Sequence, residues 1–398
     1  MPQQKHRLLY GHFALFAALF LVISCAGIQK PLLVEPVSKT IPVPKEIPVP
    51  EEIPVYSVSL IAAGDNLINQ NILDDCKDNG AFNFSPLYTE VETLIAGADI
   101  AFINQETIMA GPRFAYSGYP RFNTPSSIAV TLAGLGFNTV NHANNHVMDM
   151  GEAGIIATLD TWDAIDSVSC IGIQRTEEKS PRIVTRNNIS FGFLAYTYGT
   201  NGLGLPKGKP WMVSMIDRER IAGEVNALRP LCDFLVVSMH WGDEYFTEPN
   251  QQQKSLALFL AELGVDLVIG HHPHVLQRIE YIERHDGKKT LVFYSLGNFV
   301  SNQDRKETQL GAFAYISFNK IQDRAFINDA GLIPVFTHIE PGYKNTKVYP
   351  FFAYNDLLMQ KHRLHAKDRD FNMDFYNAYL AGLNTKLFMY NPMQKTVP

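Results

Sequence analysis

The stretch VIGHHPHVLQ, residues 268–277, places three histidines within four positions directly after an apolar run. A residue before proline is pushed towards extended backbone, so Pro273 keeps His272 out of a helix. In an extended segment, side chains two residues apart face the same way, and we therefore expect His272 and His274 to converge on one point. A single histidine at such a place is more often a hydrogen-bonded or solvated polar residue. Converging imidazoles are typical of a transition-metal site.

Other apolar runs along the chain also end in residues that can bind a metal or form hydrogen bonds. The amphipathic stretches between them, such as Glu152 to Asp163 and Gln251 to Leu263, predict helices, so the alternation indicates an α/β fold. Ligands of open α/β sheets bind beyond the carboxyl ends of strands. One such residue alone is more often a turn or capping residue, but six together predict a shared metal centre. The runs are SVSLIAAGD with Asp65, ADIAFINQE with Glu106, GFNTVNHANNH with Asn145 and His146, DFLVVSMHWG with His240, VDLVIGHHPH with His272 and His274, and TLVFYSLGNF with Ser295 and Asn298.

Length and composition define the class of protein. The chain has 398 residues, of which 46% are hydrophobic and 19% charged, so it can bury a large core in one big domain or two. Its net charge is -6, and no stripe of Lys and Arg is interleaved with aromatic residues, so we expect no nucleic-acid partner. The chain has no G-x-S-x-G elbow, which argues against a serine hydrolase, and no CxxC motif to supply thiolate zinc ligands.

The N-terminal residues predict export and lipid anchoring. Lys5 and Arg7 precede the apolar run FALFAALFLVI, residues 13–23, which is shorter than the roughly 20 residues that a membrane span needs. The order Val-Ile-Ser-Cys at the end of this region resembles a bacterial lipobox. We expect residues 1–25 to be a lipoprotein signal peptide with a lipidated Cys25, which would hold the protein on a membrane of the cell envelope, outside the cytoplasm. An ordinary cleaved signal or an uncleaved anchor is the alternative.

A proline-rich spacer follows the signal. Residues 26–56 contain the near-repeat IPVPKE, IPVPEE and IPVY, in which closely spaced prolines favour polyproline II and remove backbone donors. We expect this segment to be a semi-rigid link between the membrane and the folded part, which begins at Ser57.

In combination and order, six motifs resemble the bacterial poly-gamma-glutamate capsule biosynthesis proteins of the calcineurin-like metallophosphatase superfamily. The resemblance covers about Val58 to Phe318 and implies a four-layer αββα sandwich with a metal centre at one edge. We expect this domain to span residues 57–320 and residues 321–398 to form a C-terminal extension that packs on it. The motifs are GDNLIN, INQE, NHANNHVMDMG, MHWGDEY, GHHPHV and SLGNF.

The resemblance also implies roles for individual residues. His146 would donate a proton to the leaving group, or would orient a ligand of the metal instead. Two positions depart from the superfamily pattern: Leu67 stands where a histidine is usual, and Glu106 where a bridging aspartate is usual. The implied metal ligands are Asp65, Glu106, Asn145, His240, His272 and His274, and the expected substrate contacts are Asn66, Asn141, Asn144, Trp241, Glu244, Ser295 and Asn298.

Two functions follow from these expectations. Carboxylate and imidazole ligands suit one or two ions of Mn, Zn or Fe, so the first function is a metal-dependent hydrolase or transferase acting on a poly-gamma-glutamate-like envelope polymer or its precursor. The second is a non-catalytic accessory or anchoring subunit that works with other capsule synthesis proteins. The ligand set favours the first, because burying polar groups is costly without a use, whereas Leu67 favours the second.

Overall fold

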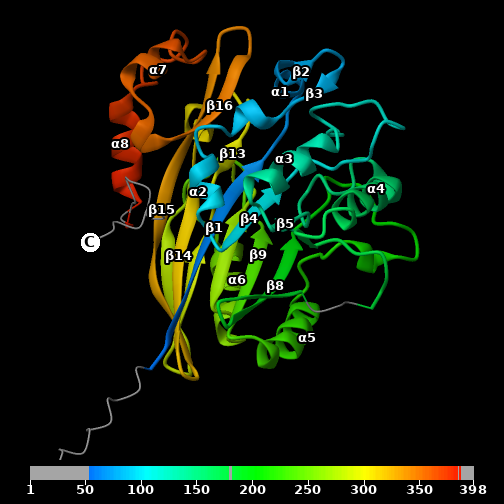
Figure 1. Ribbon diagram of the computed structural model, residues 1–398, viewed down its shortest axis with the longest axis vertical. Coiled ribbons are helices and arrows are strands. Elements are labelled where there is room, and N and C mark those ends of the chain that lie inside the picture. Colours follow the sequence, from blue (N-terminus) through cyan, green and yellow to red (C-terminus); the bar gives the residue numbers. More distant parts are fainter. Residues whose placement is uncertain (1–52, 179–181, 384, 387–398) are drawn as a thin grey trace, which may run out of the picture. The chain divides into compact units, whose positions relative to one another are not determined.

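Most strands of the protein belong to two β-sheets (Figure 1). The computed structural model describes residues 53–178, 182–383 and 385–386; the predicted signal peptide, Cys25 and most of the spacer lie outside this range. The first sheet has the order β16-β15-β14-β1-β4-β5-β6, with β13 beside β1. Its strands are β1 (Val55–Asn66), β4 (Ile100–Gln105), β5 (Thr139–Asn141), β6 (Ser169–Ile171), β13 (Asn298–Val300), β14 (Leu310–Ile321), β15 (Arg324–Glu340) and β16 (Lys344–Pro350).

The second sheet has the order β11-β12-β10-β9-β8-β7, and its four central strands are parallel. In the first sheet β1, β4, β5 and β6 are likewise parallel, so both sheets gather several carboxyl ends at one edge. The strands of the second sheet are β7 (Ile183–Arg186), β8 (Ile189–Thr197), β9 (Phe234–His240), β10 (Leu267–His271), β11 (Ile279–Glu283) and β12 (Lys289–Phe293), and β2 (Lys77–Asp78) pairs with β3 (Ala81–Phe82) apart from both sheets.

Alternation of apolar residues along the strands builds the layers. In β1, Leu60 and Ala62 belong to the core between the two sheets, while Ile61 and Ala63 belong to the core beneath the first four helices. A third core joins α5 and α6 to the outer face of the second sheet. The predicted four-layer αββα sandwich is therefore confirmed. The helices are α1 (Gln70–Asp75), α2 (Glu92–Ala96), α3 (Ser127–Leu135), α4 (Gly151–Asp163), α5 (Arg218–Leu228), α6 (Gln251–Glu262), α7 (Asp356–Lys361) and α8 (Met373–Gly382).

Local sequence explains where the helices begin. The two helices expected between strands occur as α4 and α6. At the start of α6, the side chain of Asn250 accepts from the backbone N–H of Gln253, whose side chain accepts in return from the backbone of Asn250. Among the helices of the described residues, none combines the length and the apolarity that a membrane span requires.

The run TLVFYSLGNF departs from the expectation of one strand ending in Ser295 and Asn298. It forms β12 in the second sheet and β13 in the first, and Asn298 begins β13 instead of ending a strand. The chain crosses between the sheets at Gly297, whose φ of 63° lies in the left-handed region that favours glycine. The sequence of the run gives no sign of this crossing between sheets. The crossing places Asn298 opposite Asp65 of β1.

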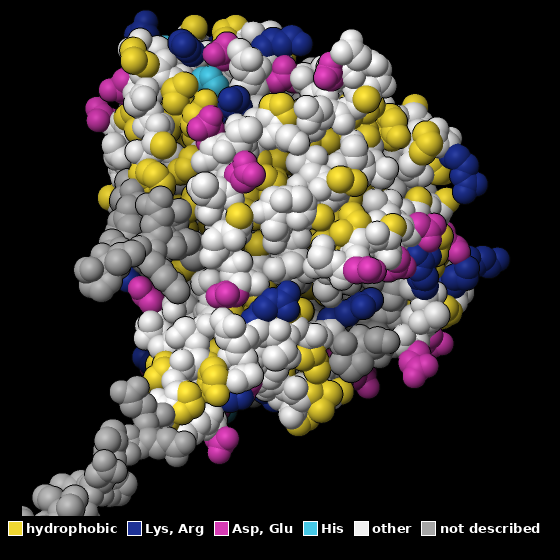
Figure 2. All heavy atoms as spheres, in the orientation of Figure 1, with side chains coloured by type: hydrophobic (Ala, Val, Ile, Leu, Met, Phe, Trp, Pro, Cys, Tyr) yellow, Lys and Arg dark blue, Asp and Glu magenta, His cyan; other side chains and the backbone are white. Residues whose placement is uncertain are grey.

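Residues beyond 320 continue the first sheet. β14 and β15 form an antiparallel hairpin around residue 322, and β16 extends the same sheet. Buried residues of α7 and α8, such as Met359, Tyr376 and Leu380, join the core between the sheets, where Tyr376 packs edge-on against Phe336. On the face seen in Figure 2, basic and acidic side chains lie next to one another without a large patch of one sign.

Candidate metal centre

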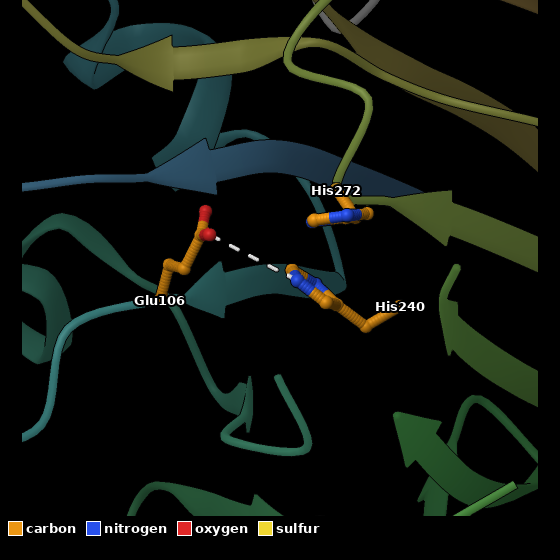
Figure 3. A group of neighbouring side chains, drawn as sticks. All are labelled: Glu106, His240 and His272. Atoms are coloured by element: carbon orange, nitrogen blue, oxygen red, sulfur yellow. Dashed lines mark ion pairs between the residues drawn. The ribbon is translucent and has the colours of Figure 1, made fainter. Parts of the chain in front are cut away.

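Five of the predicted ligands come together at one edge of the sandwich. Asp65 lies near the end of β1 and Glu106 directly follows β4, so the first sheet supplies the two carboxylates. His240 ends β9 of the second sheet, and His272 and His274 follow β10. Figure 3 shows Glu106, His240 and His272 pointing toward one another from three different elements. The centre therefore lies where the two sheets meet.

Distances between these side chains fit a shared ion. The Glu106 Oε1 atom lies 3.8 Å from both His240 Nε2 and His274 Nε2, and His274 Nδ1 lies 3.2 Å from Asp65 Oδ2. Among the described residues, three overlapping groups have ligand atoms that all lie within 4.8 Å of one another. These groups are Glu106, His240 and His272; Asp65, Glu106 and His274; and Glu244, His272 and His274.

The histidine turn does not have the extended backbone that we expected. His272 has a φ of 97° and His274 a φ of 58°, both in the left-handed region that non-glycine residues rarely adopt. The side chain of Asp65 accepts the backbone N–H of His272 at 3.1 Å, and the carbonyl of Pro273 accepts the N–H of Tyr245 at 2.8 Å. These tertiary hydrogen bonds outweigh the local preference set by Pro273, and the two rings converge across a tight bend instead.

Glu106 shows most clearly that the residues fit a metal ion. Its side chain is fully buried, and neither carboxylate oxygen has a hydrogen-bond partner. The Nδ1 atom of His272 is also buried without a partner. Unpaired buried polar atoms are costly, and buried charges are normally paired or bound to metals. Carboxylate oxygens beside neutral imidazoles are the donors that Mn, Zn and Fe accept.

The two carboxylates and His274 shift one another's pKa values. Burial opposes ionisation of Asp65 most strongly, but interactions with His271 and His274 hold the pKa of this carboxyl well below its usual range. Burial, followed by the negative charge of Asp65, raises the pKa of Glu106 well above its usual range. Burial also disfavours the charged form of His274, but Glu106 and Asp65 outweigh it and raise the pKa of His274 to about 9.

The other two histidines are held neutral, as metal ligands must be. Burial, followed by the nearby His274, lowers the pKa of His272 to about 3. Burial, followed by His272, lowers the pKa of His240 well below its usual range. Neutral imidazole is the form that binds a metal ion, so these two residues need no deprotonation before binding.

Asn145 contacts one of the candidate ligands, and His146 follows it in the chain. The Asn145 Oδ1 atom lies 3.0 Å from His240 Nε2, and its amide nitrogen donates to Asn201 at 3.2 Å. The ring of His146 is buried, packs edge-on against Phe122, and its Nδ1 atom lies 2.8 Å from a carboxylate oxygen of Asp149. Asp149 thereby fixes the orientation of the His146 ring.

Three asparagines that we expected to contact substrate are fully buried and bonded within the protein. Asn66 donates to Gln105 and accepts from Tyr88; Asn144 donates to the backbone of Gln105 and accepts the N–H of His146. Asn141 donates to Asn104, which donates in turn to Asp65 at 2.8 Å. These amides therefore form hydrogen bonds within the protein next to the candidate ligands and are not available to a substrate.

The remaining expected contacts divide into two kinds. Trp241 is not brought to the centre: it packs in the core beneath α6 and donates its indole N–H to the carbonyl of Tyr294. Ser295 is buried and accepts the N–H of Gly297. The side-chain oxygen of Asn298 lies 3.0 Å from His274 Nδ1. The exposed Glu244 forms one of the three groups of neighbouring ligand atoms together with His272 and His274. Of the expected substrate contacts, Glu244 alone is exposed to an incoming substrate.

Sequence reasoning missed two residues of the centre. Tyr198 follows β8, remains 42% exposed and packs its ring against His272 at 4.6 Å and along His240 at 6.3 Å. The run SFGFLAYTY that ends at Tyr198 has the same apolar-to-polar pattern as the six runs above, so a signal existed. His271 lies within the opening motif, and its Nδ1 atom is 3.4 Å from Asp65 Oδ1.

The amino-acid sequence is similar to those of several known bacterial proteins. The chain is 32% identical over 193 residues to the PGA biosynthesis protein CapA of Bacillus subtilis (strain 168), covering 48% of this chain and 49% of that protein. It is 32% identical over 180 residues to the capsule biosynthesis protein CapA of Bacillus anthracis, covering 44% and 42%. A probable polyglutamine synthesis accessory protein of Mycobacterium tuberculosis (strain H37Rv) is 26% identical over 228 residues, covering 52% and 56%. The matches thus span about half the length of these curated relatives.

Solved structures resemble the chain more loosely. The calcineurin-like phosphoesterase YfkN from Bacillus subtilis superposes with a TM-score of 0.42 at 12% identity, covering 83% of this chain and 100% of that one. A 5'-nucleotidase precursor from Thermus thermophilus has a TM-score of 0.43 at 14% identity, covering 71% and 54%.

The family model described as bacterial capsule synthesis protein PGA_cap matches residues 59–303, which hold every metal-binding candidate named above. This match spans more than half of the chain, and the protein therefore belongs to the PGA_cap family of bacterial capsule synthesis proteins.

Proposed function

We propose that this protein is a metal-dependent hydrolase or transferase that acts on an envelope polymer, such as poly-gamma-glutamate, or on its precursor. The observation that carries the proposal is the buried Glu106 carboxylate, which has no hydrogen-bond partner and faces His240 and His274. A side chain of this kind is costly without a cation. The relatives named for biosynthesis of PGA and of capsule support the substrate class.

Five side chains of the centre would hold the cation: Asp65, Glu106, His240, His272 and His274. Glu106 belongs to two of the three groups of neighbouring ligand atoms, as His272 and His274 also do. When bound, a divalent ion lowers the pKa of a coordinated water towards ~7 and polarises the bond under attack, which is the chemistry of phosphoryl, ester or amide hydrolysis.

His146 is the residue that we assign to proton transfer. Its Nδ1 atom contacts Asp149, so Nε2 is the atom left to exchange a proton with a leaving group. Asp149 orients the ring, as a carboxylate does for other catalytic histidines. Asn145, next in the chain, contacts His240 and would keep His146 beside the ligands.

A second function is favoured by one feature of the chain. Leu67 is buried where the family resemblance places a histidine, so one expected ligand is missing. The Mycobacterium tuberculosis relative is named as a probable accessory protein. In this alternative, the protein would assist other capsule synthesis proteins without turning over a substrate.

One experiment separates the two functions. We expect His146→Ala to lower turnover by about 10² to 10⁴, the usual contribution of general acid catalysis, while metal content stays near that of the wild type. His272→Ala should lower metal content and turnover together. The substrates are phosphomonoesters, phosphodiesters and gamma-linked glutamyl peptides, each with Mn, Zn and Fe, and the exposed His285→Ala serves as the control. If both variants leave polymer production in cells unchanged while gene deletion abolishes it, the protein is an accessory subunit.

A further inference from the structure

We propose that His271 is a positioning residue that holds the carboxylate of Asp65 in the orientation the metal centre needs, without binding the ion itself. The inference rests on the proposed metal centre and goes beyond it, because His271 has no part in the function described above.

His271 is buried among apolar groups and has a charged residue, Asp65, within reach of its ring. Its side chain is 0% exposed, and neither ring nitrogen has a hydrogen-bond partner. The ring stacks on Phe102 of β4, in the core between the sheets, with centroids 5.9 Å apart. The charged neighbour within reach is Asp65, whose Oδ1 atom lies 3.4 Å from His271 Nδ1. An apolar residue would fill this space without burying two polar nitrogens.

The two oxygens of Asp65 have different partners. Oδ1 accepts from the amide of Asn104 at 2.8 Å and faces His271. Oδ2 accepts the backbone N–H of His272 and lies 3.2 Å from His274 Nδ1. The hydrogen bond from Asn104 and the close contact with His271, both at Oδ1, thus oppose rotation of the carboxylate, and Oδ2 stays directed at the histidine turn. The left-handed backbone at His272 and His274 needs such a fixed acceptor.

His271 is well placed for positioning and poorly placed for binding the ion. It is the last residue of β10 and is paired with His240 of β9, so regular strand pairing sets its backbone. Across the part of the chain that the structure describes, none of the three groups with ligand atoms within 4.8 Å includes it. A histidine that orients a ligand carboxylate affects metal affinity through that ligand, typically by 10- to 100-fold.

Substitutions at residue 271 test the proposal by titration of the full-length, metal-stripped protein with Co²⁺, with affinity, stoichiometry and visible absorption as readouts. Asparagine offers an N–H close to the position of Nδ1, so we expect His271→Asn to bind Co²⁺ about as tightly as the wild type. We expect His271→Leu to bind about 10- to 100-fold more weakly, with the same stoichiometry and absorption spectrum. His338→Leu, at a buried histidine of β15 whose ring contacts Tyr354, should leave the affinity unchanged.

Four results would overturn the proposal. If His271→Leu binds Co²⁺ like the wild type, His271 only fills space. If it loses an ion or changes the absorption spectrum, His271 is itself a ligand. If His271→Leu does not fold, His271→Gln replaces it: its amide reaches towards the Nε2 position, so affinity equal to that of His271→Asn contradicts the role of Nδ1. A wild-type protein that binds no Co²⁺ removes the metal centre and this inference with it.

Discussion

Neighbouring histidines of this chain have opposite charge preferences. His274 lies beside two carboxylates that raise its pKa to about 9, whereas His272, two residues earlier, is governed by burial and by His274, and its pKa falls to about 3. The GHHPH motif alone does not predict that the pKa values of His272 and His274 differ. It arises from Asp65 and Glu106, which lie far away in the sequence.

Buried neutral histidines predict a loss of stability in mild acid. Burial lowers the pKa of His142 to about 3 and, with His338 as the next cause, that of His362 to about 2. The unfolded chain takes up these protons below pH ~6.5 and the folded chain does not, so the free energy of unfolding falls as pH drops. From pH ~6.5 to ~5 we expect each such histidine to remove about 2 kcal/mol.

Urea unfolding of the metal-free protein at the two pH values measures this loss. His362→Gln should reduce the pH dependence by about one histidine's share, whereas His285→Gln, at an exposed position, should not change it. A free energy of unfolding that is the same at both pH values would show that the folded state also protonates these residues.

At the level of elements, the sequence locates the strands that carry the ligands but not how they meet. The runs ending at Asp65, Glu106, His240 and His272 correspond to β1, β4, β9 and β10 because apolar patterning is a local property. The crossing at Gly297 and the left-handed turn at His272 depend on hydrogen bonds between distant segments, and propensity cannot foresee them.

A close approach between two elements predicts that Gly270 cannot be replaced. A Cβ atom at Gly270 of β10 would lie 2.0 Å from the carbonyl oxygen of Tyr294, just after β12. We expect Gly270→Ala to push these backbones apart and to destabilise the fold by about 1 to 3 kcal/mol or more. Metal binding should also weaken, because the histidine turn directly follows Gly270 in the chain.

Thermal unfolding and metal titration check this expectation. The matched control is Gly223→Ala in α5, where a Cβ meets nothing within 4 Å and an alanine should stabilise the helix by roughly 0.5 to 1 kcal/mol. Equal melting temperatures for the wild type and Gly270→Ala would show that the strands can separate at no cost.

For the whole molecule, the sequence predicted the candidate metal ligands better than the residues that hold those ligands in place. Ligands stand at strand ends and can be read one by one, whereas the contacts of His146 with Asp149 and of His271 with Asp65 follow from packing. Trp241 differs: it directly follows His240, the last residue of β9, but its side chain packs in the core beneath α6.

At the scale of the whole chain, we propose that a lipid on Cys25 anchors the protein to a membrane. The lipobox-like order before Cys25 supports the proposal, and a lipoprotein carries several acyl chains because a single chain binds membranes only marginally. Cys25→Ser should release the protein from the membrane fraction or block its processing. If the variant still fractionates with membranes and migrates like the wild type in gels, Cys25 carries no lipid.

The most direct test of the metal centre is elemental analysis of the purified protein. We expect at least one equivalent of Mn, Zn or Fe per chain, and a much lower content in His272→Ala, because Glu106, His240 and His272 surround one position. Added Mn or Zn should also raise the melting temperature of the stripped wild type, since a ligand that binds only the folded state stabilises it. A folded protein that contains no metal and whose melting temperature does not respond to Mn or Zn would contradict the metal centre.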